Sequence, residues 1–176
     1  MTPASKCGNA PTPSGLVARR RLLAATPREI LATYEVLRDE LRRRNVVRTN
    51  DAPAGQYAEW LAHRALGGML EANSVKSHDL VTRDGRKIQV KSRVLRSPSK
   101  ASERQLSPFR SFEFTEALVI LFDREYDVIR GTLLPMSVIR RNATESGHVN
   151  GRIFTARDAL LDLGTDITKR LRRVNQ

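Results

Sequence analysis

Cysteine is almost absent from this chain of 176 residues, in which Cys7 is the only thiol. A single cysteine excludes an internal disulfide framework and is typical of a protein of the reducing cytoplasm. Long apolar runs are also lacking, because no stretch approaches the ~20 residues that a membrane span requires. None follows Lys6 as it would in a secretory signal, and the Cys and His residues show no zinc-binding spacing. We therefore expect a cytoplasmic protein without a membrane partner.

Acidic residues are scarce as well. The chain has 31 Lys and Arg against 19 Asp and Glu, which gives a net charge of +12. The excess is unevenly placed, since residues 1–28 contain no acid and residues 86–110 set eight basic groups against Glu103 alone. Residues 166–176 add a further +3. Guanidinium groups suit phosphate, so nucleic acid is the first partner to consider.

The N-terminal residues differ in composition from the rest. Residues 1–25 are rich in Pro, Ser, Thr, Ala and Gly and lack apolar periodicity, which predicts a disordered basic arm. Residues 26–176 are numerous enough to bury a core in one domain without a metal or a disulfide. We therefore expect an arm at residues 1–25 followed by a single domain at residues 26–176.

Periodicity and capping signals divide the domain into helices and strands. Helical patterns begin at Thr26-Pro27 and after Pro53, and Gly67-Gly68 ends the second. Residues 117–122 are almost continuously apolar, which is typical of a strand covered on both faces. The other predicted elements are strands at 79–82, 87–95, 128–134 and 152–154, a short helix from 135 to about 141, and a helical region after 155. The expected class is α/β (α+β), a central mixed β-sheet flanked by helices.

The predicted strand 87–95 carries polar and apolar residues in alternation. Gln89 and Lys91 lie two apart and share one face, while Ile88 and Val90 take the other. The face occupied by Asp79, on the preceding strand, depends on the length of the loop between the two strands.

A three-residue loop, Arg83-Asp84-Gly85 with Gly in the left-handed position, is common in hairpins. Such a loop places Asp79 opposite Gln89, whereas a two-residue loop would place it opposite Val90, among core residues. Register follows the buried face, so the hydrophobic pattern favours the longer loop. The sequence therefore predicts a carboxylate, an amide and the ammonium of Lys91 on one face of a hairpin.

These three groups suit phosphoryl chemistry. Mg²⁺ binds oxygen ligands, often one or two carboxylates together with water and substrate phosphate. Asp79 supplies a carboxylate and Gln89 a neutral oxygen, and Lys91 can orient the attacking water or balance charge on the phosphate. Glu59 lies in the preceding predicted helix, with His63 one turn later, and can add a second acid.

A helix with Glu59, then Asp79, a short hairpin and Gln89-Val90-Lys91 resembles the PD-(D/E)XK restriction-endonuclease-like superfamily. The Gln-x-Lys form is similar to its Mrr-type restriction branch, and the resemblance covers about residues 55–134. It implies a restriction-endonuclease-like fold and a Mg²⁺-dependent DNA endonuclease, with Mn²⁺ as a substitute metal.

The resemblance also implies a role for each residue. Asp79 and Gln89 would bind the metal, with the carbonyl of Val90 as a further ligand. Lys91 would assist the attacking water, and Glu59 would complete the metal site. Catalytic residues on this interpretation are Asp79, Gln89, Lys91 and Glu59.

Two departures from the family pattern keep other functions open. His78 precedes Asp79 where the family has Pro, and Gln89, a weaker metal ligand, replaces an acid. A catalytically weak or inactive nuclease fold that binds DNA or RNA is therefore one alternative, and a basic protein-interaction subunit is another. A homodimer would cut both strands more readily than one small domain, and no motif identifies a base-reading element.

The residues after the predicted active strand form a long basic loop. They combine guanidinium and hydroxyl groups, which are standard phosphate contacts, and long loops in compact domains are usually functional or disordered. The predicted nucleic-acid contacts are Ser92, Arg93, Arg96, Lys100, Arg104 and Arg110.

Overall fold

The computed structural model describes residues 20, 22–48, 53–72, 77–95 and 101–175. Contacts divide the chain into two units, residues 1–44 and residues 45–176, and each is described by itself. The sequence placed the boundary between arm and domain after residue 25, whereas the units separate after Arg44. Most of the predicted arm, residues 1–19, lies outside the described residues.

The first unit contains one long helix, α2 (Pro27–Arg43), which begins at the proline that the sequence indicates. Residues of opposite charge three or four positions apart meet on its surface, as they do on isolated helices. These ion pairs join Arg42 with Asp39, and both Arg43 and Arg44 with Glu40.

The second unit is built on a six-stranded mixed sheet with the order β1-β2-β3-β4-β5-β8. β3 and β4 are parallel, and every other neighbouring pair is antiparallel. The predicted class, a mixed sheet flanked by helices, is confirmed, although the short strands β1 and β8 were not predicted. The strands are β1 (Met69–Leu70), β2 (Leu80–Val81), β3 (Lys87–Val94), β4 (Glu116–Phe122), β5 (Val128–Pro135) and β8 (Thr165–Asp166).

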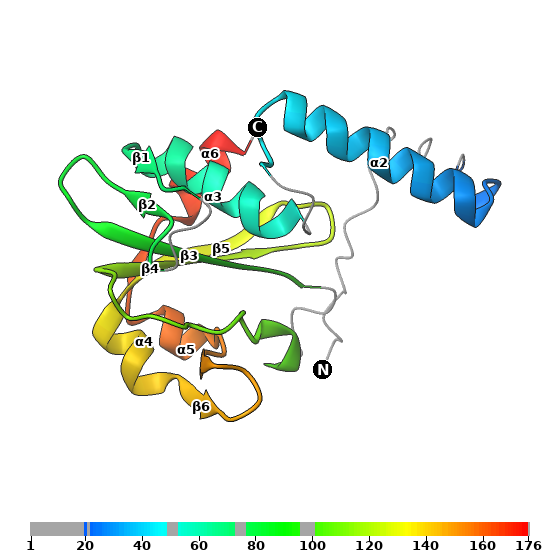
Figure 1. Ribbon diagram of the computed structural model, residues 1–176. Helices are drawn as coiled ribbons and strands as arrows, with labels where there is room; N and C mark the ends of the chain where they lie inside the picture. Colours follow the sequence, from blue (N-terminus) through cyan, green and yellow to red (C-terminus); the bar gives the residue numbers. More distant parts are fainter. Residues whose placement is uncertain (1–19, 21, 49–52, 73–76, 96–100, 176) are drawn as a thin grey trace, which may run out of the picture. The chain divides into compact units, whose positions relative to one another are not determined.

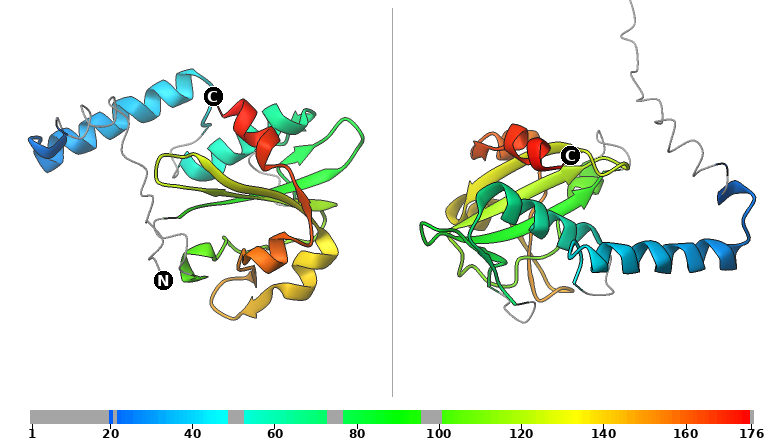
Figure 2. Two further views of the ribbon diagram at one scale, coloured as in Figure 1. Left: turned by 180° about the vertical axis from the view of Figure 1, so that it is seen from behind. Right: turned by 90° about the horizontal axis from the view of Figure 1, so that it is seen from above.

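Helices cover both faces of this sheet (Figure 1). α3 (Pro53–Leu66) and α6 (Thr168–Val174) pack on one face, with α6 against β5 (Figure 2). α4 (Met136–Asn142) and α5 (Asp158–Leu161) pack on the other. Residues 117–122 of β4 are fully buried between the two layers, which confirms a strand covered on both faces. No helix in the described part of the chain is long and apolar enough to cross a membrane.

Two further strands, β6 (Thr144–Ser146) and β7 (Gly151–Ile153), form a separate antiparallel sheet. A strand is present near the predicted range 152–154. The expectation that it would add an edge strand to the central sheet is wrong, because β7 pairs with β6. The reason lies next to β7, where Phe154 is fully buried and its carbonyl accepts a hydrogen bond from Leu106 N at 3.0 Å. This contact holds the segment in the core beneath the sheet.

Gly68, directly after α3, lies where the backbone of β2 passes very close. Its φ is +93°, and a Cβ there would lie 2.1 Å from the carbonyl oxygen of Val81 and 2.7 Å from Cα of Thr82. Glycine is required because both contacts are with backbone and the conformation is left-handed. The close approach joins the end of the helix that carries Glu59 to the hairpin that carries Asp79.

Replacing Gly68 with alanine should therefore destabilise the fold. We expect Gly68→Ala to lower the free energy of unfolding by about 2 kcal/mol or more, because strained backbone and a displaced strand both oppose it. Urea denaturation measures the change. Gly55→Ala in α3 is the matched control, since nothing lies within 4 Å of its added Cβ, and it should stabilise by about 0.5–1 kcal/mol. Equal effects of the two substitutions would contradict the assignment.

Candidate active site

The hairpin of β2 and β3 has the register that the hydrophobic pattern predicts. Leu80 pairs with Ile88, so the intervening loop has three residues, and Gly85 adopts a left-handed φ of +82°. The same register places Asp79 opposite Gln89. The prediction of the odd-length loop is therefore confirmed, and with it the common face of the polar residues.

Asp79 lies directly before the start of β2, and its carboxylate faces the side of β3 that pairs with β2. Its Oδ2 accepts a hydrogen bond from the backbone N–H of Val90 at 2.6 Å and another from the side-chain amide of Gln89. Both bonds use one oxygen, so Oδ1 receives neither of them. The carboxylate is thus held firmly by β3 while half of its hydrogen-bonding capacity stays available for a ligand.

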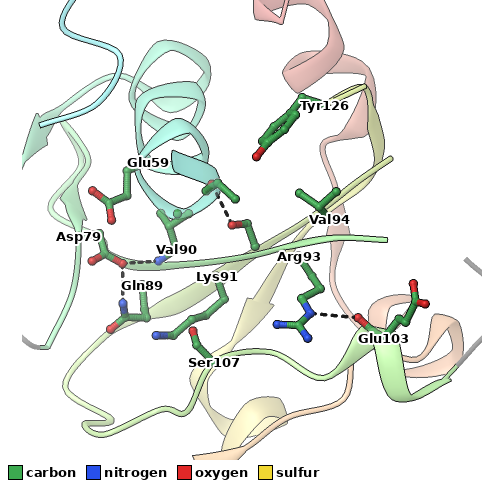
Figure 3. Close-up of a pocket in the computed structure, with 13 residues that line it drawn as sticks. Glu59, Asp79, Gln89, Val90, Lys91, Arg93, Val94, Glu103, Ser107 and Tyr126 are labelled. Atoms are coloured by element: carbon green, nitrogen blue, oxygen red, sulfur yellow. Dashed lines mark hydrogen bonds between the residues drawn. The ribbon is translucent and has the colours of Figure 1, made fainter. Parts of the chain in front are cut away.

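Glu59 and Lys91 complete a group of polar side chains in a cleft of about 880 Å³. Figure 3 shows the carboxylates of Glu59 and Asp79 near one another beside β3, with Gln89 and Lys91 close by. The structure thus brings together all four residues that the sequence singles out as catalytic. Other side chains that line the cleft are Val90, Ser92, Arg93, Glu103, Ser107 and Tyr126.

Arg48 holds Glu59 in place, and the sequence analysis missed it. Its Nη2 lies 2.6 Å from Oε2 of Glu59, and its Nη1 donates to the carbonyl oxygen of Glu71 at 2.9 Å. The side chain of Glu59 is 21 % exposed. No spacing in the sequence links residue 48 to residue 59, because the contact depends on how the chain before α3 returns to its surface.

Burial raises the pKa of both carboxyl groups in this group of four residues, Asp79 and Glu59. It raises the pKa of Asp79, against the opposing effects of the Val90 N–H, the Lys91 charge and the Gln89 amide. Burial also raises the pKa of Glu59, and the negative charge of Asp79 raises it further, while Arg48 acts in the opposite direction. Two half-buried carboxylates that repel each other form a site that a cation would stabilise.

Lys91 is shifted in the complementary direction. Burial lowers the pKa of its ammonium, Arg110 lowers it further, and the carboxylates of Asp79 and Glu59 oppose the change. Its Nζ lies 5.3 Å from the centre of the Phe109 ring. Lys91 therefore gives up a proton more readily than an exposed lysine, a property useful in a group that assists proton transfer.

The oxygen atoms of the cleft fit a hard divalent cation. The amide nitrogen of Gln89 is used by Asp79, so the amide oxygen is left for a metal. The N–H of Val90 points to the outer edge of β3, and in an extended strand the carbonyl of the same residue points to that edge too. Among the described residues, no three or more His, Cys, Asp or Glu side chains are arranged so that they could hold a metal ion together. Two carboxylates with neutral oxygens and water nevertheless suit Mg²⁺.

The predicted nucleic-acid contacts have different surroundings. Arg93 is exposed, lines the cleft, and donates from Nε to the carbonyl of Glu103 at 3.3 Å. Arg110 is exposed, and its positive charge lowers the pKa of Lys91. Ser92 also lines the cleft, although its hydroxyl donates to the Ala54 carbonyl of α3. Arg93 and Arg110 are thus the described guanidinium groups of the loop nearest to the four polar residues.

Arg104 is not brought to the cleft. Its Nη1 bonds the carboxylate of Asp158 at 2.6 Å and the carbonyl of Ala156 at 3.1 Å, and its side chain is only 13 % exposed. This residue fastens η1 (Ala101–Arg104) to the layer beneath the sheet. Arg96 and Lys100 lie outside the described residues.

The loop itself is held by apolar side chains that the sequence analysis did not single out. Leu106 and Phe109 are 2 % and 1 % exposed and belong to the second core cluster. Their burial places Ser107 in the wall of the cleft. Isolated apolar residues in a basic stretch have no periodicity, so sequence reasoning could not distinguish them from surface residues.

The raised pKa of Asp79 predicts a pH-dependent stability. A carboxyl group of this kind binds its proton more tightly in the folded chain, so it stabilises the fold below its ordinary pKa. That contribution is lost as pH rises through the raised value. In metal-free buffer, Asp79→Asn should therefore gain free energy of unfolding relative to the natural protein as pH increases from about 4 to about 7. Urea denaturation across this range tests it.

Asparagine is suitable because its Oδ1 can accept both hydrogen bonds that Asp79 Oδ2 receives. Glu113→Gln, at an exposed position, is the matched control and should give a difference that hardly varies with pH. A constant difference for Asp79→Asn would show that the carboxyl titrates alike in both states.

Comparisons of the sequence with protein families and with curated proteins found no match.

Proposed function

We propose that the protein is a Mg²⁺-dependent DNA endonuclease of the restriction-endonuclease-like kind, with Mn²⁺ as a substitute metal. The observation that carries the proposal is the meeting of Glu59, Asp79, Gln89 and Lys91 in one cleft beside β3. The shifts support it, since two acids are harder to ionise and one lysine easier to deprotonate than usual. Perturbed groups of this kind gather at catalytic sites. A cytoplasmic location stays a prediction from the single cysteine.

Each residue has a role that follows from its position. Asp79 Oδ1, the Gln89 amide oxygen, the Val90 carbonyl and Glu59 would hold the metal. When bound, Mg²⁺ would supply positive charge to the scissile phosphate and make a nearby water more acidic. Lys91 would receive or share the proton of the attacking water, because burial favours its neutral form. Holding the reacting groups in one place supplies the remaining advantage.

Arg93 and Arg110 support DNA as the substrate class. Both are exposed. Arg93 lies near the end of β3 and lines the cleft, and Arg110 lies three residues after Ser107, which also lines it. Guanidinium groups there can bind the phosphates on either side of the scissile bond. RNA stays open as a substrate, and a homodimer that cuts both strands stays a prediction.

Gln89 favours a second candidate, an inactive nuclease fold that binds DNA or RNA. Its amide nitrogen already bonds Asp79, so one of its polar atoms serves the fold, and an amide is a weaker metal ligand than a carboxylate. This candidate predicts salt-dependent binding to nucleic acid without metal-dependent cleavage. A basic protein-interaction subunit, the third candidate, would bind neither DNA nor RNA at low salt.

Cleavage of supercoiled plasmid in Mg²⁺ or Mn²⁺ tests the proposal. We expect Asp79→Asn and Lys91→Met to lower the cleavage rate by about a hundredfold or more, because each removes a group that acts on the metal or the water. Far-ultraviolet circular dichroism checks that both variants fold. Glu113→Gln is the control and should cut at the natural rate. Cleavage that survives both substitutions would refute the catalytic assignment.

A further inference from the structure

A second cleft, of about 940 Å³, lies between α6 and β5. β8 pairs only with Thr132 and Leu133 of β5, so the preceding residues of β5 pair with β4 on one side and with no described strand on the other. The cleft opens beside those residues. In the sheet order, β4 separates β5 from β3, and the catalytic cleft lies along the other side of β3. The residues of β3 and of β5 that line the two clefts thus lie on opposite sides of β4.

Basic side chains dominate the wall of this second cleft. They are Arg130, Lys169, Arg170, Arg172 and Arg173, against the single carboxylate of Asp166. Aromatic rings, which form the buried centres of many protein–protein interfaces, are not part of the described lining. Three of the four basic residues of α6 are arginines, whose planar forks bind phosphate in a bidentate way.

The charge of α6 is not neutralised within the described part of the chain. Arg130 is paired with Asp162 at 2.7 Å and with Asp166 at 3.5 Å. In contrast, no carboxylate among the described residues forms an ion pair with Lys169, Arg170, Arg172 or Arg173. The arginines near the end of α2 show the opposite arrangement, because Arg42 and Arg43 each meet an acid. The uncompensated charge of the C-terminal residues is therefore a property of this cleft.

α6 is held rigidly against β5, which fixes the position of the cleft wall. Arg172 donates from Nε to the carbonyl of Val128 at 2.8 Å and from Nη2 to that of Ile129 at 3.2 Å. Gly131 donates its backbone N–H to the buried hydroxyl of Thr168 at 2.9 Å. A Cβ at Gly131 would meet Leu171 Cδ1 at 2.1 Å, so helix and strand are in close contact. Lys169, Arg170 and Arg173 project from this rigid support and are exposed.

We propose that this cleft, which we call the α6 cleft, is a second binding site for the sugar–phosphate backbone of nucleic acid. Lys169, Arg170 and Arg173 are exposed on one short helix and form no ion pair with a described carboxylate, so their charges match the regular negative charge of such a backbone. The site takes the backbone without reading bases, since its lining offers charge in place of a base-reading element. This inference goes beyond the proposed nuclease activity and does not require it.

Binding of a labelled duplex without divalent cation tests the proposal, because cleavage is then excluded. The variant Lys169→Gln/Arg170→Gln/Arg173→Gln removes three charges from the α6 cleft and keeps Arg172, which holds the helix. Fluorescence anisotropy at several salt concentrations gives the slope of log affinity against log salt. We expect weaker binding and a slope smaller by roughly 2–3, since each lost phosphate contact on duplex DNA contributes about 0.9.

The control variant, Arg140→Gln/Arg141→Gln/Arg157→Gln, removes the same charge from exposed positions on and near α4 and α5. Its slope should change by less than about 1. Equal losses in the two variants would show a general charge effect and overturn the site, as would an unchanged slope in the α6 variant. Poly-glutamate that binds through these three residues, while DNA binding persists, would overturn it in favour of an acidic protein.

Plasmid cleavage and the salt slope, measured on the natural protein and on the α6 variant, distinguish this inference from the proposed function. A natural protein that never cleaves DNA, but whose salt slope falls in the α6 variant, would refute the nuclease and support the site. A protein that cleaves DNA, with identical slopes for the natural chain and the α6 variant, would do the reverse.

Discussion

The site depends on one contact, the acceptance of the Val90 N–H by Oδ2 of Asp79. β2 begins at Leu80, which pairs with Ile88, so the N–H of Val90 lies beyond the paired residues of these two strands. A buried donor without a partner costs about 1–3 kcal/mol, and the carboxylate of Asp79 supplies that partner. Because Gln89 donates to the same oxygen, the contact also orients the amide. A requirement of the fold and the geometry of the site are satisfied together.

The surrounding structure concentrates charge at this contact at some cost in stability. Glu59 is brought from α3 to the side of Asp79, and burial disfavours the ionised form of each. Arg48 offsets part of the cost by pairing with Glu59 from outside the cleft. Such compensation is incomplete, which is typical of sites that await a ligand of opposite charge. Gly68 makes the arrangement sterically feasible, because α3 and the hairpin can approach only where a side chain is absent.

The two clefts carry different kinds of charge. In the cleft beside β3, acidic and basic side chains are mixed, partly buried and shifted in pKa. In the α6 cleft, Lys169, Arg170 and Arg173 are exposed and form no ion pair with a described carboxylate. β4 lies between β3 and β5, so these two strands are about two strand spacings, or ~10 Å, apart.

Local patterns in the sequence determined much of this protein. The alternation of Ile88 and Val90 with polar neighbours, together with Gly85, was sufficient for the hairpin register, because a shift by one residue would bury a carboxylate. The continuous apolar run of β4 indicated a strand between two layers. These features depend on residues close together in the chain, where periodicity and turn chemistry are informative.

Contacts between distant residues were decided only by the tertiary structure. Arg48 pairs with Glu59. The buried side chains of Leu106 and Phe109 anchor a basic loop to the core. Phe154 is also buried in the core, and β7 beside it pairs with β6 instead of the central sheet. The sequence shows a net charge of +3 in residues 166–176, and only the packing of α6 on β5 places these basic residues around one cleft. None of these has a local signal, because each depends on how layers of the fold meet. The sequence thus determined which groups share a strand face, while packing determined which distant charges and apolar side chains surround them.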